Sequence, residues 1–189
     1  MCIDPVKAIA RAKKEKNMAK TVGALIAVSF LISAASVLWI GKIFSFGTVA
    51  LMFGISAFLI VFVAVIVFGY LIQLAATILG GKGKYFEGLT SMTYAMVPLS
   101  AGVFISALLS FLPYTGIINA LILAVSATAG ISILYRSIKD FFSTDMITAF
   151  VVVSVFMVSV LFTAYILAFM NFSPLLGGIM GRGMVGGIA

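Results

Sequence analysis

The fold is decided by residues 88–135, which read GLTSMTYAMVPLSAGVFISALLSFLPYTGIINALILAVSATAGISILY. This stretch holds 48 residues without a single Asp, Glu, Lys or Arg. A helix rises about 1.5 Å per residue and the hydrocarbon core of a bilayer is about 30 Å thick, so the stretch is long enough for two membrane spans. The sequence Pro113-Tyr114-Thr115-Gly116 is typical of a tight turn and predicts where the two helices separate.

Three further charge-free runs cover residues 21–41, 43–81 and 146–181. Apolar runs of about 18 or more residues are typical of transmembrane helices. Residues 50–71 contain no polar break, so we expect one span in the second run and not two. The prediction is an all-α, polytopic membrane protein whose domain, residues 21–170, is a five-transmembrane-helix bundle. Its spans are expected at about 21–40, 49–72, 89–112, 117–135 and 146–170.

Composition supports this class and removes several kinds of enzyme. Hydrophobic residues make up 63% of the chain and charged residues only 9%, whereas soluble domains carry about 25% charged residues. The chain has no histidine and a single cysteine, Cys2, which excludes imidazole catalysis, an intrachain disulfide and a cysteine-rich metal site. We therefore expect no metal, no cofactor and no enzymatic activity.

The positions of the basic residues predict the orientation. Residues 1–20, 80–88 and 136–145 together carry ten Lys and Arg, whereas the opposite side would carry only Lys42 and Arg182. Because Lys and Arg stay on the cytoplasmic side, we expect a cytoplasmic N-terminus and an outer C-terminus in the cell membrane. Basic residues next to a span favour contact with anionic lipid and argue against nucleic-acid binding.

The two ends of the chain differ in character. Asp4 and Pro5 are typical of a helix start, so residues 1–20 are expected to form a basic cytoplasmic helix on the membrane surface. Residues 171–189 contain six glycines and are expected to form an outer tail.

Small residues recur at four-residue spacing in the third and fourth predicted spans. Such stripes allow helices to approach closely in lipid, and a short turn makes these spans antiparallel partners. Pro98 removes a backbone hydrogen bond and is expected to bend its helix, with a substrate cleft at the bend as the alternative to plain packing. The candidate packing or bending positions are Pro98, Gly102, Ser106, Ala124 and Thr128.

The glycine-rich loop at residues 80–88 reads GGKGKYFEG and suggests phosphate binding at first sight. A phosphate loop requires Gly-x-x-x-x-Gly-Lys-[Ser/Thr] between a strand and a helix. Ile78 stands where the first glycine is needed, and Tyr85 follows Gly83-Lys84. We therefore reject nucleotide binding and expect a cytoplasmic loop that contacts lipid headgroups or a partner.

Several of these features occur together in one known family. The Gly-Gly-Lys-Gly loop is followed by Tyr85-Phe86, then by Thr93-Tyr94-Ala95 and Pro98, the hairpin at Pro113 and the loop YRSIKD at residues 135–140. With the opening Asp4-Pro5-Val6-Lys7, this pattern resembles the Yip family of membrane proteins (the Ypt/Rab-interacting-protein-like domain) of prokaryotic, archaeal or bacterial, type. The resemblance implies five spans and a cytoplasmic N-terminus. Eukaryotic members act in vesicle trafficking with small GTPases, but this chain lacks their Asp-Leu-Tyr-Gly-Pro signature and long N-terminal region, so that role does not transfer.

The leading functional hypothesis is a non-enzymatic scaffold or membrane-organising protein that acts through its cytoplasmic loops. Its expected partners are membrane lipids and either further copies of the chain or another membrane protein. The candidate interaction residues on the cytoplasmic face are Lys82, Lys84, Tyr85, Arg136, Lys139 and Asp140.

Two other hypotheses remain open at this point. A channel or carrier for a neutral or lipid-like solute would use the Pro98 bend, with a path lined by Tyr70, Tyr94, Asn119 and Tyr165. An intramembrane enzyme would have to rely on Glu87, Asp140 and Asp145, although Asp145 is also placed to cap the fifth span.

Overall fold

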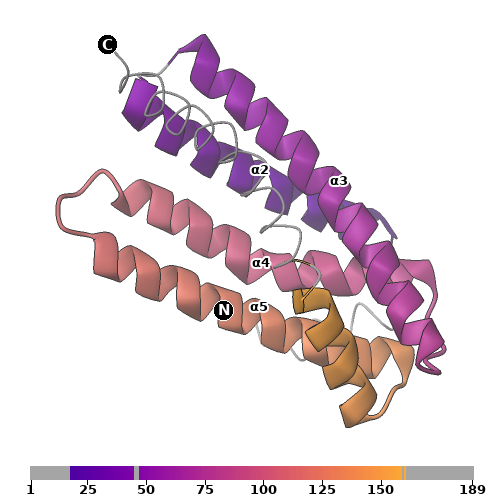
Figure 1. Ribbon diagram of the computed structural model, residues 1–189. Coiled ribbons are helices and arrows are strands. Elements are labelled where there is room, and N and C mark those ends of the chain that lie inside the picture. Colours follow the sequence, from indigo (N-terminus) through magenta and orange to yellow (C-terminus); the bar gives the residue numbers. More distant parts are fainter. Residues whose placement is uncertain (1–17, 45–46, 159, 161–189) are drawn as a thin grey trace, which may run out of the picture. The chain divides into compact units, whose positions relative to one another are not determined.

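The structure is a computed structural model that describes residues 18–44, 47–158 and 160. It contains the long helices α2 (Met18–Phe44), α3 (Thr48–Ile78), α4 (Tyr85–Leu109) and α5 (Gly116–Phe142), followed by a shorter apolar helix, Met146–Val158 (Figure 1). No strand occurs among the described residues, which confirms the all-α prediction. The expected N-terminal helix, the end of the fifth span with Tyr165, and the glycine-rich tail lie outside the described residues.

All four labelled helices are long and apolar enough to cross a membrane, so the chain is a multi-pass membrane protein. The 31 residues of α3 form one continuous helix, so the charge-free run at residues 43–81 contains one span, as expected, and not two. At about 1.5 Å per residue, α3 exceeds the thickness of the hydrocarbon core of about 30 Å. Chain contacts group the residues up to Val153 into one compact unit and those from Ser154 onward into another.

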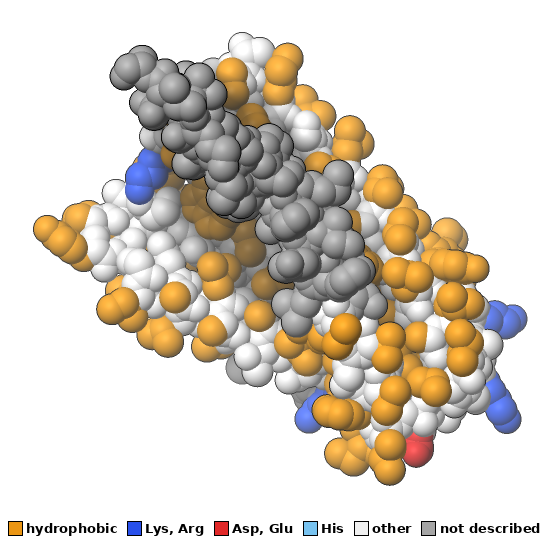
Figure 2. Space-filling model, viewed as in Figure 1, with side chains coloured by type: hydrophobic (Ala, Val, Ile, Leu, Met, Phe, Trp, Pro, Cys, Tyr) orange, Lys and Arg blue, Asp and Glu red, His pale blue; other side chains and the backbone are white. Residues whose placement is uncertain are grey.

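Within the first unit, α4 is the central helix and contacts α2, α3 and α5. Six consecutive α4 residues, 88–93, are buried on every side of the helix. Many large apolar side chains on α3 and α5 are exposed, and Figure 2 shows hydrophobic side chains spread over the outer surface. A surface of this kind faces lipid, since lipid offers no penalty for exposed apolar side chains.

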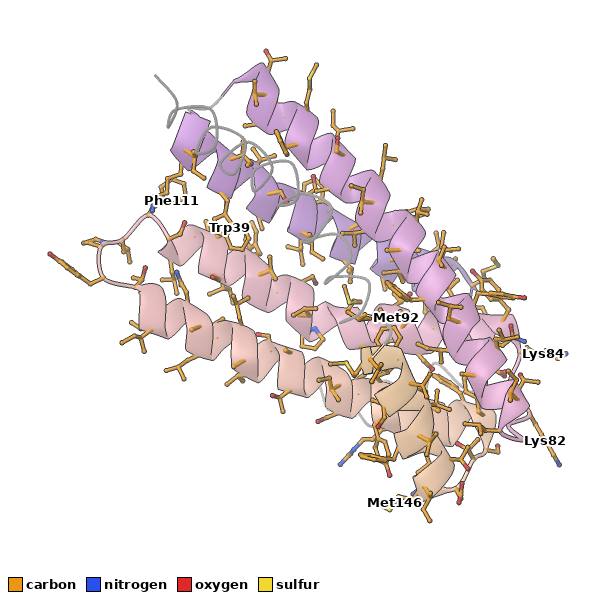
Figure 3. The ribbon with its side chains drawn as sticks, in the orientation of Figure 1. Trp39, Lys82, Lys84, Met92, Phe111 and Met146 are labelled. Atoms are coloured by element: carbon orange, nitrogen blue, oxygen red, sulfur yellow. The ribbon has the colours of Figure 1, made fainter. Side chains whose placement is uncertain are left out.

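The helices alternate in direction and define two ends of the unit. Lys82, Lys84 and Met146 lie at one end, and Trp39 and Phe111 lie at the other (Figure 3). We call the first the basic end and the second the turn end. At the turn end, Lys42 of α2 donates a hydrogen bond to the carbonyl of Ser110, which caps α4, and its ammonium lies 5.9 Å from the centre of the Phe111 ring. The predicted turn at residues 113–116 separates α4 from α5 as expected.

Glycines bring neighbouring helices into backbone contact. A Cβ on Gly54 would clash with Val37, and the hydroxyl of Ser33 donates a 2.7 Å hydrogen bond to the Gly54 carbonyl across α2 and α3. A Cβ on Gly130 of α5 would lie 2.7 Å from the Ala95 carbonyl oxygen of α4. Close approach of backbones is the usual basis of helix association in lipid.

The α4–α5 contact uses only part of the small-residue pattern. Gly102 and Ser106 are buried on α4, and a Cβ on Gly102 would clash with Ser126 of α5. Ala124 and Thr128, which the sequence suggests as partners of that stripe, are exposed instead. The reason is rotational: the face of α5 that meets α4 contains Ser126 and Gly130, so the Ala124 stripe points away from α4.

Candidate functional site: the basic end

The basic end begins where α3 stops at a glycine. Gly80 has φ +88°, a left-handed conformation that glycine adopts without the steric cost of a Cβ. Its N–H donates to the Thr77 carbonyl at 3.1 Å, and the Gly81 N–H donates to the Ala76 carbonyl at 2.8 Å. This pair of bonds is a Schellman motif, which satisfies the last carbonyls of a helix and reverses the chain.

The following residues dock on the end of α5. We call residues 80–83 the glycine loop. The Lys82 N–H donates a 3.1 Å hydrogen bond to the carbonyl of Phe142, whose side chain is completely buried. A Cβ on Gly83 would collide with the Phe142 ring, and one on Gly81 would lie 3.2 Å from the Phe142 Cβ and 3.1 Å from Thr144 Cγ2. The loop is therefore held against α5 by a backbone bond and by contacts that only glycine allows.

The start of α4 is capped by its own acidic residue. Lys84 is the N-cap, and its backbone N–H donates to the carboxylate of Glu87 in the first turn. A carboxylate at this position complements the positive end of the helix dipole.

The candidate interaction residues all lie at the basic end, but they do not all have the same surroundings. Lys82 and Lys84 have exposed side chains that extend away from the helices (Figure 3). The exposed residues of the last turns of α5 are Arg136, Lys139 and Asp140. Tyr85 differs from them, because its ring lies 6.3 Å from that of Tyr70 and its hydroxyl is 3.4 Å from the Ile66 carbonyl, so it contacts α3.

Asp145 caps the helix Met146–Val158, as the sequence predicts. Its carboxylate accepts a 3.0 Å hydrogen bond from the Thr148 N–H, and the Ala149 N–H donates to its carbonyl. Hydrogen bonding to Thr148, first through the side chain and then through the backbone, lowers the pKa of Asp145. The carboxylate therefore serves as a cap, which is the structural alternative to a catalytic role.

The proposed solute path is not assembled among the described residues. Pro98 lies inside α4 and does not end the helix. Tyr70 is 52% exposed on α3, toward the basic end, whereas Asn119 lies in the first turn of α5, at the turn end. A groove of about 410 Å³ occurs elsewhere, between α2 and α3 at the turn end, and its lining includes Trp39 and Phe53.

Sequence reasoning missed two features of the helix bundle. The first is the role of Phe142, which nothing in an apolar pair such as Phe141-Phe142 distinguishes from ordinary lipid-facing residues. The second is a set of fully buried hydroxyls on α2, α4 and α5: Ser29, Ser91, Thr93, Ser100 and Ser137. For the contact with Phe142, the one available signal in the sequence is the pair Gly81 and Gly83, because two glycines around a lysine indicate close backbone contact.

Nothing in the described part of the chain gathers three or more Cys, Asp or Glu residues into a group suited to a metal ion. The fold and this end together define a multi-pass helical membrane protein in which the loop between α3 and α4 is packed on the end of α5. The model of the Yip1 domain matches residues 1–178, so the chain belongs to the Yip1 family, and the resemblance seen in the loops is confirmed. No curated protein and no solved structure matches the chain.

Proposed function

We propose that this protein is a non-enzymatic scaffold or membrane-organising protein that binds a partner through its basic end. The observation that carries the proposal is the attachment of the glycine loop to the end of α5, through the Lys82 N–H and the Phe142 carbonyl. A loop held by its backbone presents Lys82 and Lys84 in a fixed position. Binding then costs less ordering entropy than it would for a flexible loop.

Charge at this end favours an acidic partner segment. Two of the acidic groups near the exposed lysines are engaged in helix caps, Glu87 at α4 and Asp145 at the helix Met146–Val158. Complementary charge increases the rate of encounter and selects the partner. Membrane lipids with anionic headgroups are a second class of partner that the same charges favour.

We further propose that the basic end faces the cytoplasm of the cell membrane. The support is the excess of Lys and Arg at the segments that this end connects. Lys82→Cys and Tyr114→Cys, each in a Cys2→Ser background, report the two sides with a membrane-impermeant maleimide on intact cells. Labelling of Tyr114→Cys alone would support this orientation, and labelling of Lys82→Cys alone would show the opposite orientation.

Association with further copies of the chain is supported by the outer face of α5. Exposed small residues recur there at every fourth position: Gly116, Ala120, Ala124, Thr128 and Ser132. A stripe of this kind, left unused by α4, suits close packing with the helix of another membrane protein or a second copy.

The deciding experiment is purification from native membranes in mild detergent, followed by native mass spectrometry. The scaffold proposal expects a stoichiometric second protein or a homo-oligomer. Lys82→Glu with Lys84→Glu should remove a partner that binds the basic end, while Lys82→Arg with Lys84→Arg should retain it. A charge-reversed variant that keeps every associated protein would contradict the role of the basic end.

A further inference from the structure

Most serine and threonine hydroxyls with a hydrogen bond in this bundle donate it to a carbonyl of their own helix. Each donates to a carbonyl three or four residues earlier, which is the common solution for hydroxyls in membrane helices. The residues that do so are Ser36, Thr77, Thr90, Ser100, Ser110, Thr128 and Ser132. A hydroxyl that departs from this pattern leaves its donor proton and its lone pairs available to another group.

Four hydroxyls in the core depart from the pattern. The hydroxyl oxygens of Ser29, Ser91, Thr93 and Ser137 are buried and have no hydrogen-bond partner among the described residues. Each of these residues is 0% exposed. An unpaired buried hydroxyl is costly, and in a bilayer the surrounding lipid supplies no partner.

Two of these hydroxyls belong to residues at the same level of the neighbouring helices α4 and α5. The helices are antiparallel, and a Cβ on Gly130 of α5 would lie 3.9 Å from the Pro98 Cγ of α4. Seven residues make two helical turns and return to the same face. Two turns before Pro98 is Ser91, and two turns after Gly130 is Ser137, so the register places these serines at the same level of the helix pair.

The two serines do not bond directly to each other in the structure, although each has a proton to donate and lone pairs to accept. A ligand that satisfies both must be small and must donate and accept hydrogen bonds. We infer that α4 and α5 hold a bound water molecule between the hydroxyls of Ser91 and Ser137. Buried waters typically make 2–4 hydrogen bonds to polar groups of this kind.

The position lies close to the basic end. Ser91 lies six residues into α4, or about 9 Å from the start of the helix at the basic end. The other two unpaired hydroxyls belong to Ser29 of α2 and Thr93 of α4.

The test measures whether water reaches these positions. In a Cys2→Ser background, Ser91→Cys and Ser137→Cys each place one thiol at the site with little change in size. The infrared S–H band of the protein in lipid vesicles is followed after transfer to D2O, because a thiol in contact with water exchanges its proton for deuterium. The matched control is Val65→Cys, which is 1% exposed on α3. Val65 lies on α3, one turn before Gly69, and the described residues of α3 include no unpaired buried hydroxyl.

We expect the thiols at positions 91 and 137 to lose the S–H band while the thiol at position 65 retains it. Equal retention at all three positions would overturn the inference. A second measurement covers the case in which a cysteine variant fails to fold: Ser91→Ala and Ser137→Ala are compared singly and together. The free energy of unfolding is measured for each variant. If one water binds both hydroxyls, removal of the second serine lowers this free energy much less than removal of the first. Additive losses would again contradict a shared water.

Discussion

Gly69 of α3 and Gly88 of α4 bring the backbones of two membrane helices into direct contact. A Cβ on Gly69 would lie 2.8 Å from the Cα of Leu89, and a Cβ on Gly88 would collide with the Gly69 carbonyl oxygen. Both residues are buried. The contact sets the distance at which α4 passes α3, immediately beside the glycine loop.

Gly88→Ala should therefore destabilise the bundle. The added methyl meets backbone, which cannot move aside as a side chain would, and overpacking of this kind costs about 1–3 kcal/mol. Unfolding in mixed detergent micelles measures the loss. Gly23→Ala is the matched control, because a Cβ there meets nothing within 4 Å and the residue lies inside α2. It should be neutral or slightly stabilising, since alanine has the higher helix propensity. Equal losses in the two variants would show that the Gly69–Gly88 contact is not the cause.

Gly83→Ala should release the glycine loop from α5 without altering any charge. Its Cβ would overlap the buried Phe142 ring, so either the loop or the ring must move. Limited trypsin digestion after Lys82 or Lys84 reports the release as faster cleavage. Phe142→Leu in the same chain removes part of the obstructing ring and should restore some of the protection. Unchanged cleavage in Gly83→Ala would mean that the ring contact does not hold the loop.

The positions of the helices could be predicted from the sequence, but the side of each helix that packs against its neighbour could not. Charge-free runs and the turn at residues 113–116 predict α4 and α5 because length and apolarity alone decide whether a segment spans a membrane. The rotation of α5 was not predictable, since Ala124 and Gly130 are both small and only packing decides which one meets α4. The contact between the glycine loop and Phe142 joins residues sixty positions apart in the sequence, and no local sequence pattern predicts a contact of this kind.

Asp145 should make the helix Met146–Val158 sensitive to acid. Hydrogen bonds from Thr148 lower the pKa of the folded carboxyl, so the ionised form is favoured by folding. Its contribution is fully present above the pKa of the unfolded carboxyl and is lost as pH falls through the lower folded value. Amide exchange at Thr148, measured against pH, should show protection that decreases in this acidic range. Asp145→Asn retains a capping oxygen and should lose the pH dependence, and a variant with the same acid profile as the original would exclude Asp145 as the cause.

Ala124→Leu should weaken self-association while leaving the bundle folded. Ala124 is exposed on α5, in the middle of the outward stripe of small residues, and a leucine there would keep two backbones apart. A clash of about 1–3 kcal/mol corresponds to an increase of about 5- to 140-fold in the dissociation constant. Counting photobleaching steps of labelled protein in liposomes, at a series of protein-to-lipid ratios, measures that constant.

Val125→Leu is the control for Ala124→Leu. Val125 is 69% exposed and adjacent in sequence, but it lies about 100° away around the helix. If both variants associate as the original does, copies of the chain do not meet through this face of α5. If both dissociate, added bulk at the lipid surface is sufficient, and the stripe has no special role.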